Sequence, residues 1–438
     1  MVKKKIKFVN LWSQAKKVIP GGNMLLSKRP EMFLPNSWPT YYSKSKGCNI
    51  WDLNNKKYID VSLMGVGTNI LGYANSAVDK KVKEVIKKGN MTTLNCSEEV
   101  ELAKKLLSMH EWNGMVKFAR TGGEAAAIAV RIARAYTKKD KVMACGYHGW
   151  HDWYLASNLK NTSDLNGHLL NNTKFEGVPK NLKKTIQMFD YNNIKNFKKI
   201  FEKNKKHVGV IIMEVSRNFQ PDDNFLKTIA QTCKKNNVIL IVDECSSGFR
   251  ESFGGLYKKY NFLPDIVLYG KAIGNGYPLT AIVGKKRIMQ KAQDTFISST
   301  FWTDRIGPVA ALETLKQMEK IKSWEVITNK GKLVKKEWKK IFDRFQLNVD
   351  ILGIDVLPLF KFKNKSHLKY KTFITQEMLK KGYLASNIIY LSIAHTDQIL
   401  KKYFIHFEQV IKKLSNLINQ KKFRLNNAVC HSEMKRIN

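Results

Sequence analysis

Six short apolar segments alternate with helical segments between about residue 115 and residue 285. They are five to seven residues long and rich in β-branched side chains, which suits strands buried on both faces of a sheet. Regular alternation of such strands with helices is typical of an α/β architecture around a largely parallel sheet. The segments read MVKFA, KVMAC, VGVIIME, VILIVDE, DIVLYG and TAIVG.

The regions on either side of this block have a different pattern. The N-terminal region combines a short helix with a β-rich hairpin around DLNNKKY. After residue 308, one long amphipathic helix precedes two or three short strands (VDILGI, LPLFKFK and NIIYLSIA) and a Lys-rich helix. We therefore predict an N-terminal segment over 1–60, a large α/β domain over 61–310, a smaller α+β domain over 311–422 and a flexible tail over 423–438.

The chain has 438 residues and a formal net charge of +40, from 76 basic and 36 acidic residues. Such a charge raises the distant alternative of a basic nucleic-acid-binding protein. However, Lys is spread along the whole chain in KK pairs, and no basic stripe is interleaved with aromatic residues. This distribution favours a positive surface that attracts small anionic substrates, without nucleic acid as a partner.

Cysteine usage and hydropathy bear on metal binding and location. The six cysteines are scattered, and none is paired at metal-ligand or CxxC spacing, so we predict no metal site. No apolar run approaches the ~20 residues that span a bilayer. The basic start of the chain has no small-residue cleavage site after it. We therefore expect a cytoplasmic protein without a membrane association.

A glycine pair follows the first apolar segment and precedes an Ala-rich helix. Thr121, Gly122 and Gly123 stand directly before Glu124, where the helix is predicted to open. Glycines allow backbone N–H groups to approach an anion closely, and the start of a helix attracts negative charge. This pattern is consistent with a phosphate-binding turn, although a Gly-Gly turn in this position is more often a simple helix cap.

Two charged side chains end buried strands at the edge where α/β proteins bind ligands. Asp243 ends VILIVD, and Lys271 follows DIVLYG. A Lys at the end of an apolar strand is costly to bury in its charged form, and a neutral amine is what imine formation requires. Tyr147 and His148 begin an aromatic cluster after another strand, and this cluster suits either stacking on a planar ring or simple packing.

Together, in this order, these motifs resemble the class III pyridoxal-phosphate aminotransferases of fold type I, and glutamate-1-semialdehyde 2,1-aminomutase in particular. The resemblance extends over nearly the whole chain. It rests on AKKVIPGGN, IWDLNNKKYIDV, TGGEAAAIAVRIARAYT, GYHGWHD, VDECSSGF, PDIVLYGKAIGNGYP and LSIAHTD. It implies pyridoxal 5'-phosphate as the cofactor, a small-molecule amino donor and carbonyl acceptor, and a homodimer with shared active sites.

The resemblance also implies roles for individual residues. Lys271 would form the Schiff base and move the proton, while Asp243 would hold the ring nitrogen. The remaining cofactor-binding positions are Thr121, Gly122 and Gly123 at the phosphate, Tyr147 with His148 and Cys245 at the two ring faces, Glu214 and Asn218 beside the ring hydroxyl, and Thr300 at the phosphate of the neighbouring subunit.

The sequence departs from the family pattern at several positions that bear on the substrate. Gly123 stands where the family usually has Thr, so one phosphate-binding hydroxyl is missing unless Thr121 compensates. Val66 replaces a Trp of the aminomutase, and Arg29, a candidate for the substrate carboxylate, is shifted by one residue. These departures leave two readings open, a transaminase with two separate substrates and an aminomutase that moves the amino group within one molecule.

Overall fold

The structure is a computed structural model that describes residues 8–170, 175–216, 219–425 and 427–432. The chain forms two compact units. The larger unit is Ser76–Glu325, and the smaller one combines Met1–Asn75 with Val326–Asn438.

The unit boundaries fall about fifteen residues later than the predicted 60/61 and 310/311. Residues 62–75 stay in the smaller unit because Gly47 and Tyr73 form a β-bridge there. The helix α10 (Ile306–Ile321) stays in the larger unit because it packs against α3 (Ser76–Ile86) and α4 (Ser97–Leu107).

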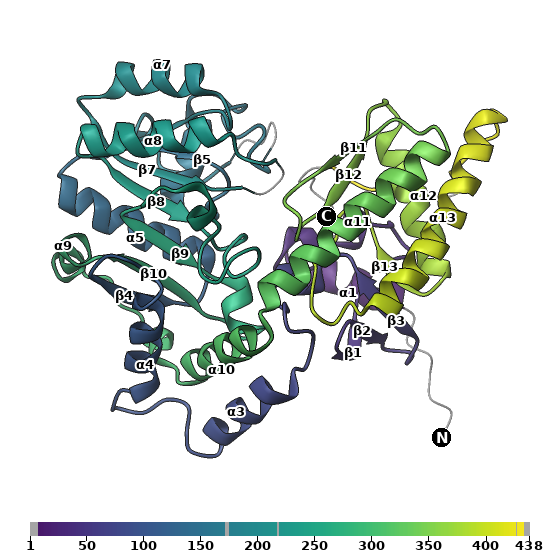
Figure 1. The fold of residues 1–438 in the computed structure, drawn as a ribbon, viewed down its shortest axis with the longest axis horizontal. Coiled ribbons are helices and arrows are strands. Elements are labelled where there is room, and N and C mark those ends of the chain that lie inside the picture. Colours follow the sequence, from purple (N-terminus) through teal and green to yellow (C-terminus); the bar gives the residue numbers. More distant parts are fainter. Residues whose placement is uncertain (1–7, 171–174, 217–218, 426, 433–438) are drawn as a thin grey trace. The chain divides into compact units, whose positions relative to one another are not determined.

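The larger unit is built on a seven-stranded sheet in the order β4-β10-β9-β8-β7-β5-β6 (Figure 1). Only β10 runs antiparallel to its neighbours, so the predicted, largely parallel α/β sheet is confirmed. The strands are β4 (Gly114–Ala119), β5 (Lys141–Cys145), β6 (Ile186–Met188), β7 (Val208–Glu214), β8 (Ile239–Asp243), β9 (Ile266–Tyr269) and β10 (Thr280–Lys285).

The central strands are apolar along their whole length because both faces are covered. Every residue of β7 and β8 is buried. On one face, alternate residues such as Val210 and Ile212 join the alanines of α5 (Gly122–Thr137) in one core cluster. The other helices of this unit are α6 (Asp152–Leu155), α7 (Ile194–Asn204), α8 (Asp223–Lys235) and α9 (Lys286–Met289).

The smaller unit combines two sheets with helices, as the predicted α+β pattern requires. The first sheet has the order β1-β2-β3-β13, and the second pairs β11 with β12. Trp338, Phe342, Phe360 and Phe407 pack together in its core. The elements are α1 (Phe8–Val18), α2 (Met64–Gly67), α11 (Ser323–Arg344, which begins at the end of the larger unit), α12 (His367–Lys380), α13 (Asp397–Asn419), β1 (Tyr42–Lys46), β2 (Asn49–Asp52), β3 (Lys57–Val61), β11 (Val349–Leu352), β12 (Leu359–Phe362) and β13 (Tyr383–Ala385).

Two expectations for the C-terminal half, a single long helix and a strand over NIIYLSIA, are wrong. The long helix is divided into α10 and α11 because Lys322 adopts a left-handed conformation with φ of 45°. The segment NIIYLSIA is not a strand, since its N–H groups donate to separate segments, among them Ser62 and Val356. The described residues of the predicted flexible tail are docked on α12, where Cys430 is 2% exposed and its N–H donates to Thr372 Oγ1 at 3.0 Å.

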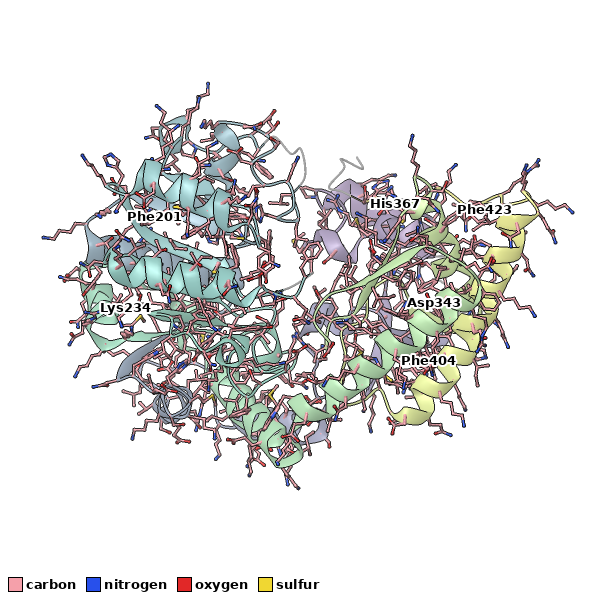
Figure 2. All side chains as sticks on the ribbon, turned by 45° about the horizontal axis from the view of Figure 1, so that its top comes forward. Phe201, Lys234, Asp343, His367, Phe404 and Phe423 are labelled. Carbon is pink, nitrogen blue, oxygen red and sulfur yellow. The ribbon has the colours of Figure 1, made fainter. Side chains whose placement is uncertain are left out.

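Short 3-10 helices complete the described structure. They are η1 (Leu26–Lys28), η2 (Pro30–Met32), η3 (Ala156–Leu159), η4 (Lys180–Leu182), η5 (Leu256–Tyr260), η6 (Lys271–Gly274), η7 (Gln290–Thr295) and η8 (Thr300–Thr303). Lys234 on α8 illustrates how the abundant lysines project from the surface (Figure 2). None of the helices in the described ranges is long and apolar enough to cross a membrane.

Candidate active site

The carboxyl ends of four parallel strands bring most of the predicted site residues to one edge of the large sheet. Tyr147 and His148 follow β5, Glu214 ends β7, and Asp243 ends β8. Lys271 follows β9, with one glycine between the strand and η6. Parallel strands end at the same edge, so the order of the strands brings these side chains together.

Asp243 is buried, 5% exposed, and its two carboxylate oxygens have different partners. Oδ2 accepts a hydrogen bond from His148 Nδ1 at 2.8 Å, and Oδ1 accepts one from the N–H of Cys245 at 3.0 Å. Burial alone would raise the pKa of Asp243, but the bonds from His148 and Cys245 hold its pKa below the ordinary value. The carboxyl group is therefore held as an anion inside the protein.

Lys271 is held in an unusual backbone conformation. Its φ of 44° lies in the left-handed region, which costs roughly 1–2 kcal/mol for a residue with a side chain. Its Nζ donates a hydrogen bond to the buried Ser246 Oγ at 2.6 Å. The strained turn and this bond together aim the amine at the loop that follows Asp243.

The Cys245 side chain packs closely against Gly270 and lies in ordinary contact distance of Gly122. A Cβ added at Gly270 would lie 3.2 Å from Cys245 Sγ, and one added at Gly122 would lie 3.6 Å from it. Burial raises the pKa of the Cys245 thiol well above its usual value. Cys245 is therefore an uncharged, packed side chain between the start of α5 and the turn before Lys271.

The helix α5 begins with a capping box. Thr121 Oγ1 accepts a hydrogen bond from the N–H of Glu124, whose Oε2 accepts bonds from the N–H and the hydroxyl of Thr121. No described residue accepts a hydrogen bond from the N–H of Gly122 or Gly123. These two donors at a helix start are available to an anion, whereas the Thr121 hydroxyl is already used in the cap.

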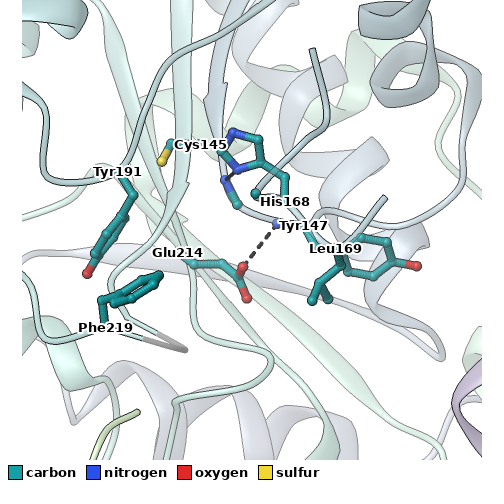
Figure 3. Close-up of a pocket in the computed structure, with 9 residues that line it drawn as sticks. Cys145, Tyr147, His168, Leu169, Tyr191, Glu214 and Phe219 are labelled. Atoms are coloured by element: carbon teal, nitrogen blue, oxygen red, sulfur yellow. Dashed lines mark hydrogen bonds between the residues drawn. The ribbon is translucent and has the colours of Figure 1, made fainter. Parts of the chain in front are cut away.

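Tyr147 is positioned by its backbone and by its aromatic neighbours. Its N–H donates to Glu214 Oε2 at 3.0 Å, and its ring lies edge-on to Tyr154 with centroids 6.1 Å apart. Next to it, His168 Nδ1 accepts the N–H of Gly146 at 3.0 Å. Tyr147, His168 and Glu214 line a cavity of about 60 Å³. Figure 3 shows the bond from the N–H of Tyr147 to Glu214 there.

Three predicted site residues are not assembled with the others by the described structure. Thr300 is exposed in η8, and Trp302 of the same 3-10 helix donates from Nε1 to Glu124 Oε1 at 3.2 Å. Arg29 belongs to the smaller unit, where its guanidinium covers Gly21. Asn218 lies outside the described residues.

Sequence reasoning missed two residues of this edge. Ser246 lies inside the VDECSSGF motif, but nothing in the pattern indicates that its hydroxyl meets Lys271. His151 lies in GYHGWHD, and its ring packs beside Gly123. The sequence indicates that Ser246 and His151 each lie in a loop after a strand. It does not indicate the direction in which either side chain points.

The residues present fit pyridoxal phosphate. A buried anionic carboxylate suits a protonated ring nitrogen, and an amine on the next strand suits the aldehyde carbon. The two unpaired N–H groups at the start of α5 suit the phosphate. The fold and this set of groups define a pyridoxal-phosphate-dependent transferase of fold type I.

More particularly, the chain belongs to the class III aminotransferase family, whose model matches residues 35–417. It is an enzyme that uses pyridoxal phosphate to transfer an amino group. It is 32% identical over 407 residues to 3-aminobutyryl-CoA aminotransferase of Cloacimonas acidaminovorans, covering 90% of this chain and 93% of the relative. It is 31% identical over 433 residues to glutamate-1-semialdehyde 2,1-aminomutase of Wigglesworthia glossinidia brevipalpis, covering 93% of this chain and 98% of the relative.

Solved structures with the same fold are pyridoxal-phosphate transaminases. The FumI protein of Sphingopyxis sp. MTA144, in its PLP internal aldimine form, has a TM-score of 0.86 at 21% identity and covers 95% of this chain and 98% of its own. An omega-transaminase from Sphaerobacter thermophilus has a TM-score of 0.83 at 17% identity, covering 94% of this chain and 98% of its own. At this identity the likeness establishes the fold.

Proposed function

We propose that Lys271 attaches the cofactor and moves the proton in a transaminase with two separate substrates, an amine donor and a carbonyl acceptor. The observation that carries this proposal is the pair of groups on neighbouring strand ends, the Lys271 amine beside Ser246 and the buried Asp243 carboxylate. When bound, pyridoxal phosphate withdraws electrons from the substrate carbon that loses its proton. Lys271 would be the base for that proton, because its amine follows β9, which pairs with the strand that carries Asp243.

Asp243 has the complementary role of holding the ring nitrogen in its protonated form. His148 orients the carboxylate through Oδ2, and the N–H of Cys245 fixes Oδ1. Because the group is buried, its negative charge acts in a medium of low dielectric constant, where it is little screened.

The remaining residues would position the cofactor. Gly122 and Gly123 would bind the phosphate through their N–H groups. Tyr147 and Cys245 would contact the two ring faces. Glu214 would support this wall through its bond to the N–H of Tyr147. Asn218, which lies outside the described residues, would contact the ring hydroxyl.

The choice between transaminase and aminomutase rests on the substrate end of the site. Val66 lies where the aminomutase has Trp, and the Arg29 segment differs in length, so the groups that would retain a glutamate-semialdehyde intermediate are changed. A transaminase releases its keto product before the second substrate binds. These changes therefore favour a transaminase that releases its keto product over an aminomutase that retains its intermediate.

The test is to incubate the purified protein with glutamate-1-semialdehyde and, separately, with donor and acceptor pairs. We expect release of a keto product from the donor, with no 5-aminolevulinate. The donors should include β-amino acids and their thioesters, in view of the 3-aminobutyryl-CoA aminotransferase relative, and the acceptors should include sugar-linked ketones. Formation of 5-aminolevulinate would establish the aminomutase alternative.

We also propose a homodimer with shared active sites, in which Thr300 reaches the phosphate of the neighbouring subunit. In the single chain, Phe301 is 70% exposed and Leu94 is 81% exposed. Their segments are joined, because Asn90 accepts hydrogen bonds from the N–H groups of Arg305 and Ile306. Large exposed apolar side chains in joined segments indicate a surface that a partner covers.

A cytoplasmic location is the further expectation. It is supported by six free cysteines in the described structure, four of them buried, since thiols of this kind persist in a reducing compartment.

A further inference from the structure

The space beside Gly123 is filled by the ring of His151. A Cβ added at Gly123 would lie 2.9 Å from both Nδ1 and Cε1 of His151, and 3.7 Å from the Cα of Gly149. The resemblance to the class III aminotransferases implies a phosphate-binding Thr at this position. In this chain the imidazole therefore occupies the place where that Thr side chain would project.

The nitrogen of His151 that faces Gly123 has no partner. Nδ1 is buried, and no described residue forms a hydrogen bond with it. The ring itself is fixed, because it stacks on Trp150 at 4.5 Å and its backbone carbonyl accepts the N–H groups of Tyr154 and Leu155. Leaving a buried polar atom unpaired costs free energy, so a rigid ring in this position indicates a ligand atom that completes the bond.

The Thr121 hydroxyl cannot take this role without breaking the helix cap. Thr121 accepts from the N–H of Glu124 and donates to its carboxylate. The phosphate end of the site thus has two free backbone donors, from Gly122 and Gly123, and one free side-chain nitrogen, from His151.

We propose that His151 Nδ1 donates a hydrogen bond to the cofactor phosphate, in place of the missing Thr hydroxyl. This inference rests on the proposed phosphate position at the start of α5. It makes His151 a binding residue for the cofactor, with the Gly123 position left small to admit its ring.

The experiment compares binding of pyridoxal phosphate with binding of pyridoxal, which lacks the phosphate, by absorbance titration of the apo protein. His151→Leu removes the donor, while His151→Asn keeps an N–H at the same distance from the backbone. We expect His151→Leu to weaken pyridoxal phosphate binding by roughly 10- to 100-fold, the range for a hydrogen bond to a charged group, with pyridoxal changed by less than about 2-fold. His151→Asn should retain most of the affinity.

The double variant Gly123→Thr with His151→Ala tests directly whether a Thr hydroxyl can replace the His151 imidazole at the phosphate. It should bind pyridoxal phosphate more tightly than His151→Ala alone, because the hydroxyl returns to the space that the ring has left. Thermal melting of each apo variant checks that the fold is intact.

Equal weakening of both ligands, or none, would overturn the role of His151 while leaving the proposed function in place. A wild-type protein that binds neither pyridoxal phosphate nor pyridoxal would contradict both the role of His151 and the proposed function. In that case the wild-type titration would be no different from that of Lys271→Ala.

Discussion

Asp243 has a defined partner at each carboxylate oxygen, His148 at one and the N–H of Cys245 at the other. The position of Asp243 and Lys271 could be predicted from the sequence, because each follows a strand apolar enough to be buried. The contact between Lys271 and Ser246 could not, since it depends on how two loops fold toward each other. The Thr121 hydroxyl, which could compensate for the missing Thr at the phosphate, takes part in the capping box of α5.

Asp243→Asn should leave cofactor attachment to Lys271 intact while lowering kcat by roughly 100- to 1000-fold, because the charge that holds the ring nitrogen protonated is lost. The measurement is the rate of the first half-reaction in a stopped-flow spectrophotometer. Asp265→Asn is the matched control, since this carboxylate lies at the opposite end of the sheet, where it binds the N–H of Leu240. Similar losses in both variants would contradict the role of Asp243.

Glu244 gives a prediction about stability and pH. Burial raises the pKa of Glu244 to about 7, while its unfolded value is 4.5. Between these values the folded state binds more protons than the unfolded state, so this group's contribution to stability falls as pH rises from about 4.5 to 7. Glu244→Gln removes that loss and keeps both partners, since its amide can donate to Ser247 Oγ and accept from the N–H of Tyr257.

The melting temperature of Glu244→Gln should therefore exceed that of the wild type by about 2–5 °C at pH 8, with little difference near pH 4.5. Scanning fluorimetry across this range measures it. The exposed Glu202→Gln on α7 is the control and should give a difference that does not vary with pH. A gain for Glu244→Gln that is largest at low pH would contradict the assignment.

At the scale of elements, the six predicted strands correspond to β4, β5, β7, β8, β9 and β10. The three-residue edge strand β6 was missed because it is too short for a periodic pattern. The order of the strands could not be predicted, since buried parallel strands carry similar apolar sequences and their pairing depends on the whole core. The division of the long C-terminal helix at Lys322 depends on one backbone angle, for which the sequence has no glycine or proline signal.

The loop after β5 contacts the start of α5 so closely that position 149 has no room for a side chain. Gly149 has φ of +101°, and an added Cβ would lie 2.7 Å from the Cα of Gly123. Gly177 has φ of +84° with open space around it. Gly177→Ala should cost roughly 1–2 kcal/mol from the left-handed conformation alone. Gly149→Ala should cost clearly more in urea unfolding, because backbone atoms must also move, and equal losses would contradict this packing.

At the scale of the whole molecule, the charge of +40 comes from lysines distributed over the chain, and the exposed apolar side chains are the more informative surface feature. The boundaries of the units were predicted only approximately. Contacts between segments far apart in sequence, such as the bridge from Gly47 to Tyr73, determine which unit a connecting segment joins.

Phe301→Asp should convert the proposed dimer to monomers and weaken cofactor binding, because a buried charge opposes association and Thr300 would no longer reach the partner's phosphate. Sedimentation velocity at micromolar concentration measures the first effect. Leu263→Asp is the control, since Leu263 is 53% exposed in the turn before β9, at the opposite edge of the sheet from Lys271. A Phe301→Asp protein that remains dimeric and keeps its cofactor would contradict the shared site.

The central claim is that Lys271 holds the cofactor, and chemical trapping tests it most directly. The purified protein is loaded with pyridoxal phosphate, reduced with borohydride and digested, and the modified peptide is identified by mass spectrometry. We predict one stoichiometric modification, on Lys271, that is absent in Lys271→Ala. Modification of another lysine instead, or none in the wild-type protein, would contradict the account.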